Sequence, residues 1–277
     1  MPDVVPSSPA SVPVGVDTTR ASIARVYDAA LNGKDNYPID REVLRQVATV
    51  APQVNELAWS NRNFLVRACR FLAGEVGITQ YLDCGSGLPT AENTHQIVQR
   101  LQPTARVLYI DNDPVVLAHG RALLEENERT RFLAADIFKP DEVLSHPEVR
   151  DFLDWTQPIA LIQNGTLHHY VGDDTAELMK TYIDALPSGS HTVIAHFLDP
   201  QTPKHSELAR QMEYRFTHSP MGSGVFRTWD QIKAMFAGLE MVPPGVVLCD
   251  NWWPDGPRVK PLNQVQECIA CGVGRKP

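Results

Sequence analysis

The sequence predicts an α/β fold in which helices cover both faces of a doubly wound, mostly parallel sheet of seven strands. Apolar strand segments alternate regularly with helical segments after Gly77. The first strand runs into a Gly-x-Gly turn at Gly85 and Gly87, before a helical segment. Two consecutive strands end at an acid, Asp83 and then Asp111. Together these features indicate a nucleotide-type site at the carboxyl ends of the strands.

Each element of the alternation has its own segment. Strands are expected at 80–83, 106–110, 130–135, 158–163 and 190–197. Helices are expected at 91–101, at 114–126, at 140–145 with a further turn through 153, and at 175–186. Because parallel strands joined by helices are buried on both faces, each strand should be apolar along its whole length, and these segments mostly are.

The chain on either side of the alternation predicts additions to the sheet. Residues 1–17 are rich in Pro, Val and Ser and are expected to form a flexible arm. Three helices are expected in 18–76 as an amino-terminal cap, the second opening at Asp40, before a sheet domain at 77–277. A polar insertion at 201–227 with a helix at 204–216 should follow strand five. A helix at 228–236 and strands at 240–248 and 265–273, the last antiparallel, should complete the sheet.

Composition excludes several classes of protein. The chain has 277 residues, 43% of them hydrophobic, and a net charge of −8, which argues against a nucleic-acid partner. No apolar run is long enough to cross a bilayer, and the amino terminus lacks the features of a secretory signal. The five cysteines are scattered, which is typical of reduced thiols in a cytoplasmic protein. Cys268 and Cys271 have the spacing of a redox pair or half a zinc site, but a strand would turn them to opposite faces.

The Gly-x-Gly turn and its two acids indicate the kind of ligand. Glycines let the backbone approach a ligand closely, and Asp111 is spaced to accept hydrogen bonds from ribose hydroxyls. A dinucleotide fingerprint would need glycine at Thr90. The carboxylate of Asp83 would repel phosphate but suit an ammonium or sulfonium group. These features match S-adenosylmethionine better than NAD.

Four segments carry a resemblance to a known family. They are Ser22-Ile-Ala-Arg-Val-Tyr-Asp, Gly33-Lys-Asp-Asn-Tyr, Asp83-Cys-Gly-Ser-Gly-Leu-Pro-Thr and Tyr109-Ile-Asp-Asn-Asp-Pro-Val-Val, with further matches at Ala135-Asp136 and Pro244-Gly-Val-Val. The chain resembles the class I S-adenosylmethionine-dependent methyltransferases, and more narrowly an actinobacterial S-adenosyl methyltransferase family of unassigned substrate. The resemblance implies a Rossmann-like methyltransferase sheet and S-adenosylmethionine as cofactor.

The resemblance also implies which residues bind the cofactor. The first strand and its turn would line the methionine end, Asp111 and Asn112 the ribose, Asp136 and Ile137 the adenine, and Asn164 the sulfonium. The expected cofactor-binding residues are Asp83, Gly85, Ser86, Gly87, Asp111, Asn112, Asp136, Ile137 and Asn164. Tyr27 and Lys34 join them on the expectation that the segment Tyr27 to Tyr37 closes over the cofactor as a lid. The chain departs from the class at Thr90, where a third glycine is common, and at Gln-Asn-Gly-Thr, which disfavours methylation of nucleic-acid bases.

Two adjacent histidines, His168 and His169, end strand four and are the candidate catalytic residues. Either could deprotonate an acceptor hydroxyl or amine, and either could instead be a hydrogen-bonded core residue. His196 is a weaker candidate. No carboxylate or third histidine has the spacing of a metal site with them, so no metal is expected. Trp252 and Trp253 could wall an acceptor pocket or pack the last hairpin against the sheet.

The sequence therefore predicts a methyltransferase acting on oxygen or nitrogen of a small-molecule acceptor. Two alternatives stay open at this point: a non-catalytic S-adenosylmethionine-binding protein, and an NAD-dependent oxidoreductase. A homodimer is also left open.

Overall fold

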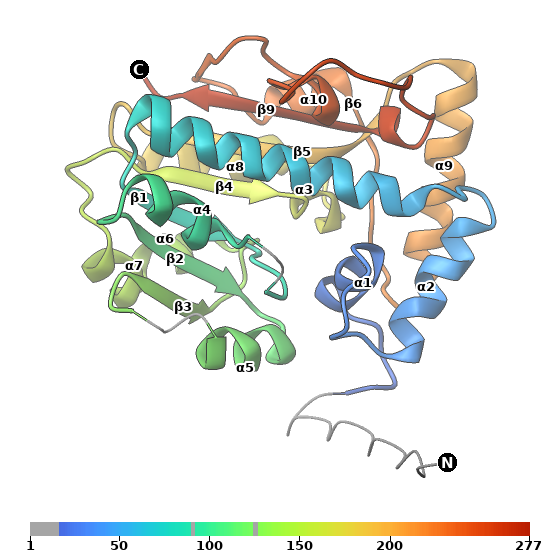
Figure 1. Cartoon of the computed structure of the whole chain (residues 1–277), viewed down its shortest axis with the longest axis horizontal. Helices are drawn as coiled ribbons and strands as arrows, with labels where there is room; N and C mark the ends of the chain where they lie inside the picture. Colours follow the sequence, from blue (N-terminus) through green and yellow to red (C-terminus); the bar gives the residue numbers. More distant parts are fainter. Residues whose placement is uncertain (1–16, 90–91, 124–126) are drawn as a thin grey trace, which may run out of the picture.

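The structure, a computed structural model, describes residues 17–89, 92–123 and 127–277. Within them, an open sheet of nine strands has the order β3-β2-β1-β4-β5-β9-β7, with β6 beside β5 and β8 beside β9 (Figure 1). The strands are β1 (Gln80–Cys84), β2 (Arg106–Asp111), β3 (Thr130–Ala134), β4 (Ala160–Asn164), β5 (His191–Asp199), β6 (Arg227–Thr228), β7 (Glu240–Met241), β8 (Val247–Leu248) and β9 (Ile269–Arg275). Strands β1 to β5 are mutually parallel and β9 is antiparallel to β5, which confirms the predicted fold class.

The count of nine against the predicted seven has two causes. The strand expected at 240–248 is divided into β7 and β8, because Pro243 and Pro244 have no N–H to give to a strand ladder. Both pieces still pair with β9. The short strand β6 forms where the chain leaves the insertion and pairs with the end of β5. Strand β9 also begins at Ile269, after a 3₁₀ turn, later than the expected start at 265.

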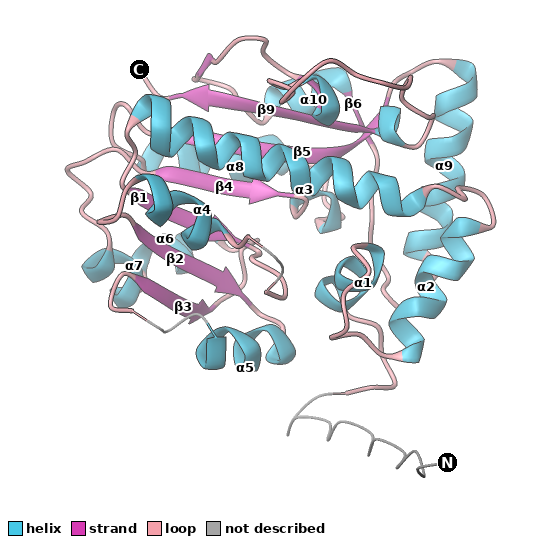
Figure 2. Ribbon diagram, in the orientation of Figure 1, coloured by secondary structure: helices cyan, strands magenta, loops and turns pink. Residues whose placement is uncertain are grey.

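Alternate side chains along the strands enter two separate apolar cores, one on each face. Tyr81, Val107 and Ile162 face one core, whereas their neighbours Leu82 and Leu108 face the other. Helices α3 (Val54–Phe71), α4 (Thr94–Leu101) and α5 (Pro114–Leu123) cover the first face. Helices α6 (Pro140–Ser145), α7 (Pro147–Phe152), α8 (Thr175–Ala185) and α10 (Trp229–Ala234) cover the second (Figure 2). The sheet is therefore doubly wound.

Three predictions lie outside the described residues: the arm up to residue 16, the helix start at 91 and the helix end at 124–126.

Three helices lie beyond the carboxyl ends of the parallel strands (Figure 1). They are α1 (Ile23–Ala30), α2 (Pro38–Ala48) and α9 (Pro203–Thr217), and α2 packs against both others. Ser22 caps α1 by accepting the backbone N–H of Arg25 at 3.3 Å. The expectation that Asp40 opens α2 is wrong. The helix begins earlier, at Pro38, and Asp40 reaches back from the third position to the backbone N–H of Tyr37 at 2.8 Å.

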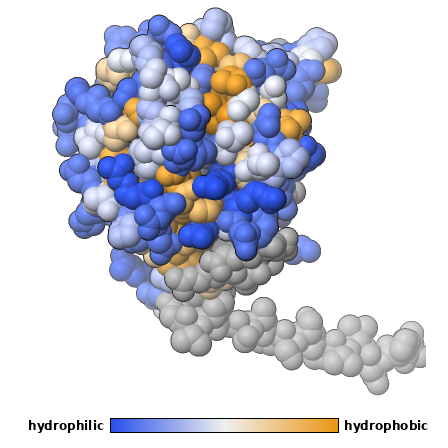
Figure 3. Space-filling model, turned by 90° about the vertical axis from the view of Figure 1, so that its left-hand side faces the viewer, coloured by the Kyte–Doolittle hydropathy of each residue, from blue (hydrophilic) through white to orange (hydrophobic). Residues whose placement is uncertain are grey.

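The opposite side of the molecule, near the amino ends of the strands, is mostly hydrophilic with scattered apolar side chains (Figure 3). None of the helices in the described part of the chain combines the length and apolar character that a bilayer span requires.

Candidate functional site

A cavity of about 660 Å³ opens where β1 to β5 end, between the sheet and helices α1 and α3. The predicted cofactor-binding residues that line it are Tyr27, Asp83, Gly85, Ser86, Gly87, Asp111, Asn112, Asp136, Ile137 and Asn164. His168 and His169 line it as well. Lys34 does not: its side chain is exposed on the loop between α1 and α2. The fold thus brings together predicted residues from the ends of β1 to β4, as parallel strands with a common edge require.

The glycine turn after β1 is folded tightly against neighbouring strands. Gly85 has φ +75°, and a Cβ there would lie 2.3 Å from Cγ2 of Thr166, so only glycine fits. Gly87 has φ +64°, and its backbone N–H donates to Oδ2 of Asp111 at 2.9 Å. Space beside Gly87 is open, with no atom within 4 Å of a Cβ built there. A ligand can therefore approach this backbone closely.

Asp111 is held in place by backbone donors. Besides Gly87, the N–H of Asp113 donates to its Oδ1 at 3.0 Å. Burial raises the pKa of Asp111, and these backbone hydrogen bonds oppose the rise. A carboxylate has about four lone-pair sites, so these hydrogen bonds leave it capacity for a ribose hydroxyl. Asp113 itself accepts the N–H of Val115 at 2.7 Å and caps α5, as its position before Pro114 predicts.

Asp83 is the most perturbed carboxyl group of the site. Burial raises its pKa to about 6, while the Thr94 hydroxyl, which donates to Oδ2 at 2.6 Å, and the nearby Arg62 guanidinium act in the opposite direction. Arg62 also lines the cavity and donates to the backbone carbonyl of Glu92 at 2.6 Å. A cationic ligand group beside Asp83 would favour its ionised form.

The side chains of Asn61 and Asn164 line the cavity, and the amide oxygen of each is buried. Oδ1 of Asn61 and Oδ1 of Asn164 have no hydrogen-bond partner among the described residues. The Asn61 Nδ2 donates to the Tyr27 hydroxyl at 2.9 Å, so only the oxygen lacks a partner. Since buried polar atoms are normally satisfied, these oxygens fit a ligand that carries hydrogen-bond donors. S-adenosylmethionine, with its ammonium group and ribose hydroxyls, is such a ligand, and the residues present fit it.

The two candidate catalytic histidines have different surroundings. His168 is buried, and its ring stacks on Phe197 with centroids 3.5 Å apart. His169 is half-buried and its Nδ1 lies 2.9 Å from Oγ of Ser223. Burial lowers the pKa of His168 well below its usual range and that of His169 to about 3. Both rings are therefore neutral at physiological pH. His196 is a core residue whose Nδ1 is 2.7 Å from the Phe197 carbonyl.

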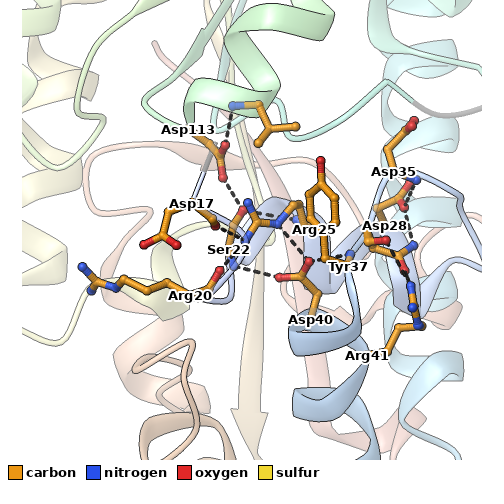
Figure 4. Close-up of polar contacts among 12 residues, drawn as sticks. Asp17, Arg20, Ser22, Arg25, Asp28, Asp35, Tyr37, Asp40, Arg41 and Asp113 are labelled. Carbon is orange, nitrogen blue, oxygen red and sulfur yellow. Dashed lines mark hydrogen bonds and ion pairs between the residues drawn. The ribbon is translucent and has the colours of Figure 1, made fainter. Parts of the chain in front are cut away.

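Helix α1 is fixed over the cavity by buried polar contacts (Figure 4). The Ser22 hydroxyl donates to Asp113, which ties the start of α1 to the turn after β2. The guanidinium of Arg25 is buried and pairs with Asp40 at 2.9 Å. Asp40 also accepts the backbone N–H of Ser22 at 3.1 Å. One carboxylate thus joins α1 to α2.

The loop Gly33–Tyr37 contacts the second half of α1, through Asp28. Asp28 accepts the backbone N–H of Asp35 at 3.0 Å and the side-chain amide of Asn36 at 2.8 Å. A Cβ at Gly33 would lie within 2 Å of the Asp28 carboxylate, which explains the glycine. Among the residues of the predicted lid segment, Tyr27 and Ala30 line the cavity and the loop does not.

Sequence reasoning missed the individual residues that α3 and the insertion contribute to the cavity. Asn61 and Arg62 come from α3, and Phe216 and Met221 from α9 and the loop after it. Asn61 could have been found, because it interrupts an apolar stripe of α3 at an inward position. Arg62 carries no local signal.

Other candidate groups lie outside the cavity. Trp252 is buried and packs on Phe64 and Phe71, and Trp253 stacks on Trp252, so the pair supports the last strands. Cys268 and Cys271 are buried free thiols. Within the described residues no cluster of three or more His, Cys, Asp or Glu side chains could hold a metal.

The fold and the cavity define an S-adenosylmethionine-dependent methyltransferase, and comparison with known proteins agrees. A family model described as S-adenosyl methyltransferase matches residues 9–277. The chain belongs to this family, and its cofactor is S-adenosylmethionine. The family assignment leaves the two alternatives, a non-catalytic binder and an NAD-dependent oxidoreductase, without support.

Two solved structures are similar over nearly the whole chain. A Thermobifida fusca protein, provisionally assigned as a methyltransferase, is 41% identical, covers 97% of this chain and 99% of its own, and gives a TM-score of 0.89. A DUF574 family protein from Streptomyces avermitilis is 33% identical, covers 94% of this chain and 99% of its own, and gives 0.87. No curated protein matches the chain.

Proposed function

We propose that this enzyme methylates an oxygen or nitrogen atom of a small-molecule acceptor. One observation carries the proposal: the glycine turn, Asp83 and Asp111 line the same enclosed cavity as Asn164 and the two histidines. Residues of helices α1 and α3 line this cavity together with the strand ends, so the space fits small molecules better than a folded macromolecule.

The chain's own residues would bind and orient. Asp111 would accept the ribose hydroxyls, Asp136 and Ile137 would flank the adenine, and Asp83 would lie beside the cationic end. Asn61 and Asn164 would offer their free oxygens to donors in the cavity. When bound, S-adenosylmethionine would supply a methyl group bonded to a sulfonium, a leaving group that keeps the bonding electron pair.

Most of the rate enhancement would come from positioning, because the methyl group is already activated. Helix α1 excludes water above the strand ends. His169 would receive an acceptor proton; its place in the cavity lining and the 2.9 Å contact of its Nδ1 with Oγ of Ser223 support this role. A neutral amine acceptor would need no base before the transfer.

The test is the fate of a labelled methyl group. Purified enzyme is incubated with an extract and with S-adenosylmethionine labelled in the methyl group, and the mixture is then separated by molecular size. The label should appear in the small-molecule fraction. The Asp111→Ala variant supplies the control for non-enzymatic transfer. Label confined to the protein or nucleic-acid fraction would contradict a small-molecule acceptor.

The role of Asp111 gives a separate prediction. Asp111→Ala should weaken binding of S-adenosylhomocysteine by about 1.5–3 kcal/mol, or roughly ten- to a hundred-fold, because charge-assisted hydrogen bonds are lost. Calorimetry measures this, with Asp230→Ala on α10 as a matched control for an acid outside the cavity. Equal affinity of wild type and Asp111→Ala, with the fold intact, would remove Asp111 from the ribose site.

A further inference from the structure

The walls of the cavity differ in chemistry from one end to the other. Charged side chains, among them Asp83, Asp111 and Arg62, gather at the ends of β1 to β3 and on α3. The end beyond β4 and β5 is apolar. Its wall is formed by side chains from β5, α9, the loop after α9 and β9, namely Phe197, Phe216, Met221 and Ile269.

We propose that this apolar end binds the methyl acceptor as an uncharged, planar aromatic molecule whose reacting group is a ring hydroxyl. The proposal rests on the proposed function, because the polar end must hold the cofactor for the apolar end to hold the acceptor. It goes further by naming the acceptor class.

A stack of near-parallel rings supports a planar aromatic acceptor. The ring of Phe197 is stacked on His168 at 8° between planes. Phe216 and Phe226 lie 5.6 and 4.8 Å from Phe197, at 21° and 23°. His168, Phe197 and Phe216 all line the cavity. Both the faces and the edges of such rings attract another aromatic ring, and Met221 beside them can adapt to its outline.

The charges around this end support an uncharged acceptor. Among the described residues that line it, the ionisable ones are His168 and His169, and both are neutral. The nearby charged side chains of Arg227 and Glu213 are already hydrogen-bonded within the protein, to His196 and the backbone N–H of Phe226 respectively. A carboxylate or ammonium group of an acceptor would therefore lose its water without gaining a partner of opposite charge.

The position of His169 supports a ring hydroxyl as the reacting group. Its ring lines the cavity and its Nδ1 lies 2.9 Å from Oγ of Ser223, so the second ring nitrogen is the one available to an acceptor hydroxyl; burial lowers the pKa of the ring and makes it a weak base. A ring hydroxyl, with a pKa near the value of about 10 for tyrosine, suits it better than an aliphatic alcohol. In the transfer the hydroxyl oxygen bonds to the methyl carbon, the electron pair of the broken methyl–sulfur bond stays on sulfur, and the hydroxyl proton leaves through His169 to solvent.

Calorimetry in the presence of saturating S-adenosylhomocysteine tests the acceptor class without catalysis. The probes are 1- and 2-naphthol, their carboxylated analogues and 2-naphthylamine. We expect the naphthols to bind at least ten-fold more tightly than the carboxylates. When S-adenosylmethionine replaces S-adenosylhomocysteine, we expect the naphthols to be the probes that are methylated.

Two matched variants locate the binding. Phe216→Leu removes a ring that lines the cavity and should weaken naphthol binding about three- to ten-fold, the range of a lost aromatic contact. Phe226→Leu removes a ring of the same stack that does not line the cavity and should change it less than two-fold. Affinity for S-adenosylhomocysteine should be unchanged in both.

Any of four outcomes would overturn the acceptor class: carboxylates that bind as well as the naphthols, no binding by either naphthol, methylation of the amine in place of the naphthols, or equal effects of the two variants. The proposed function would still stand in each case, provided that the wild type binds S-adenosylhomocysteine. Absence of S-adenosylhomocysteine binding to the wild type would overturn both.

Discussion

Asp83 illustrates how a single residue can cost stability and serve binding. Its carboxyl group is buried at the end of β1, and burial raises its pKa from an ordinary value near 4 to about 6. The folded protein therefore keeps a proton that the unfolded chain loses between about pH 4 and pH 6. Stability of the ligand-free protein falls as pH rises through this window and then levels off. The ionised group costs on the order of 3 kcal/mol at pH 8.

We expect Asp83→Asn to raise the melting temperature of the ligand-free enzyme at pH 8 and to leave it unchanged at pH 4, because asparagine can still accept from Thr94 without carrying a charge. The same substitution should weaken S-adenosylhomocysteine binding, whose ammonium group needs the carboxylate. Wild-type affinity should fall as pH drops below about 6. An affinity that is constant from pH 8 to pH 5, or one whose pH dependence survives in Asp83→Asn, would show that Asp83 does not face the cationic group.

Residues differ in how far the sequence alone could assign them. Asp83, Gly85 and Asp111 could be predicted because each follows an apolar strand directly, so a local pattern fixes its position at the sheet edge. Arg62 and Phe216 could not. They reach the cavity because α3 and α9 pack at particular rotations against the sheet, and long-range packing sets those rotations. Lys34 shows the converse, because a polar, glycine-led loop looked like a ligand contact yet serves to hold Asp28.

At the scale of elements, α1 and α2 are joined through Asp40. This carboxylate receives the Arg25 guanidinium and the backbone N–H groups of Ser22 and Tyr37, all away from solvent. The alternation of strands and helices was predictable from periodicity, but this junction was not. The sequence shows Asp40 only as an acid near a helix start, and its burial depends on how two helices meet.

Asp40→Ala should therefore lower the free energy of unfolding by about 3–5 kcal/mol, the cost of leaving a buried partner charge uncompensated. The exposed pair of Glu42 and Arg45 on the same helix provides a matched control, and Glu42→Ala should cost less than about 1 kcal/mol. Chemical denaturation of both variants measures the difference. Similar losses in the two variants would show that the buried pair contributes no more than a surface pair.

At the scale of the whole molecule, the position of α1 decides how ligands enter. Residues 20–24, Val26 and Tyr27 line the cavity at the strand edge. The contact between Ser22 and Asp113 ties them to the turn that follows Asp111. The cavity has no comparable cover from the loop Gly33–Tyr37. We expect a cofactor to enter past α1, and α1 to move away from the strand ends when it does. The first turns of α1 are the expected lid, in place of the segment from Tyr27 to Tyr37.

Hydrogen exchange separates the two lids. Amide exchange in Ile23–Tyr27 should slow when S-adenosylhomocysteine binds, because closure over a ligand orders the segment, while Gly33–Tyr37 should be unaffected.

Ser22→Ala removes both the cap of α1 and the tie to Asp113. It should speed S-adenosylhomocysteine release and exchange in α1. Thr228→Ala is the control, because it removes a comparable cap from α10, outside the cavity, and should cost a similar amount of stability, about 1 kcal/mol. It should change neither the release of S-adenosylhomocysteine nor the exchange in α1. If both variants release the ligand at the same rate, the effect of Ser22 is general destabilisation and α1 is a fixed wall. Protection of the loop in place of α1 would instead restore the lid at Tyr27 to Tyr37.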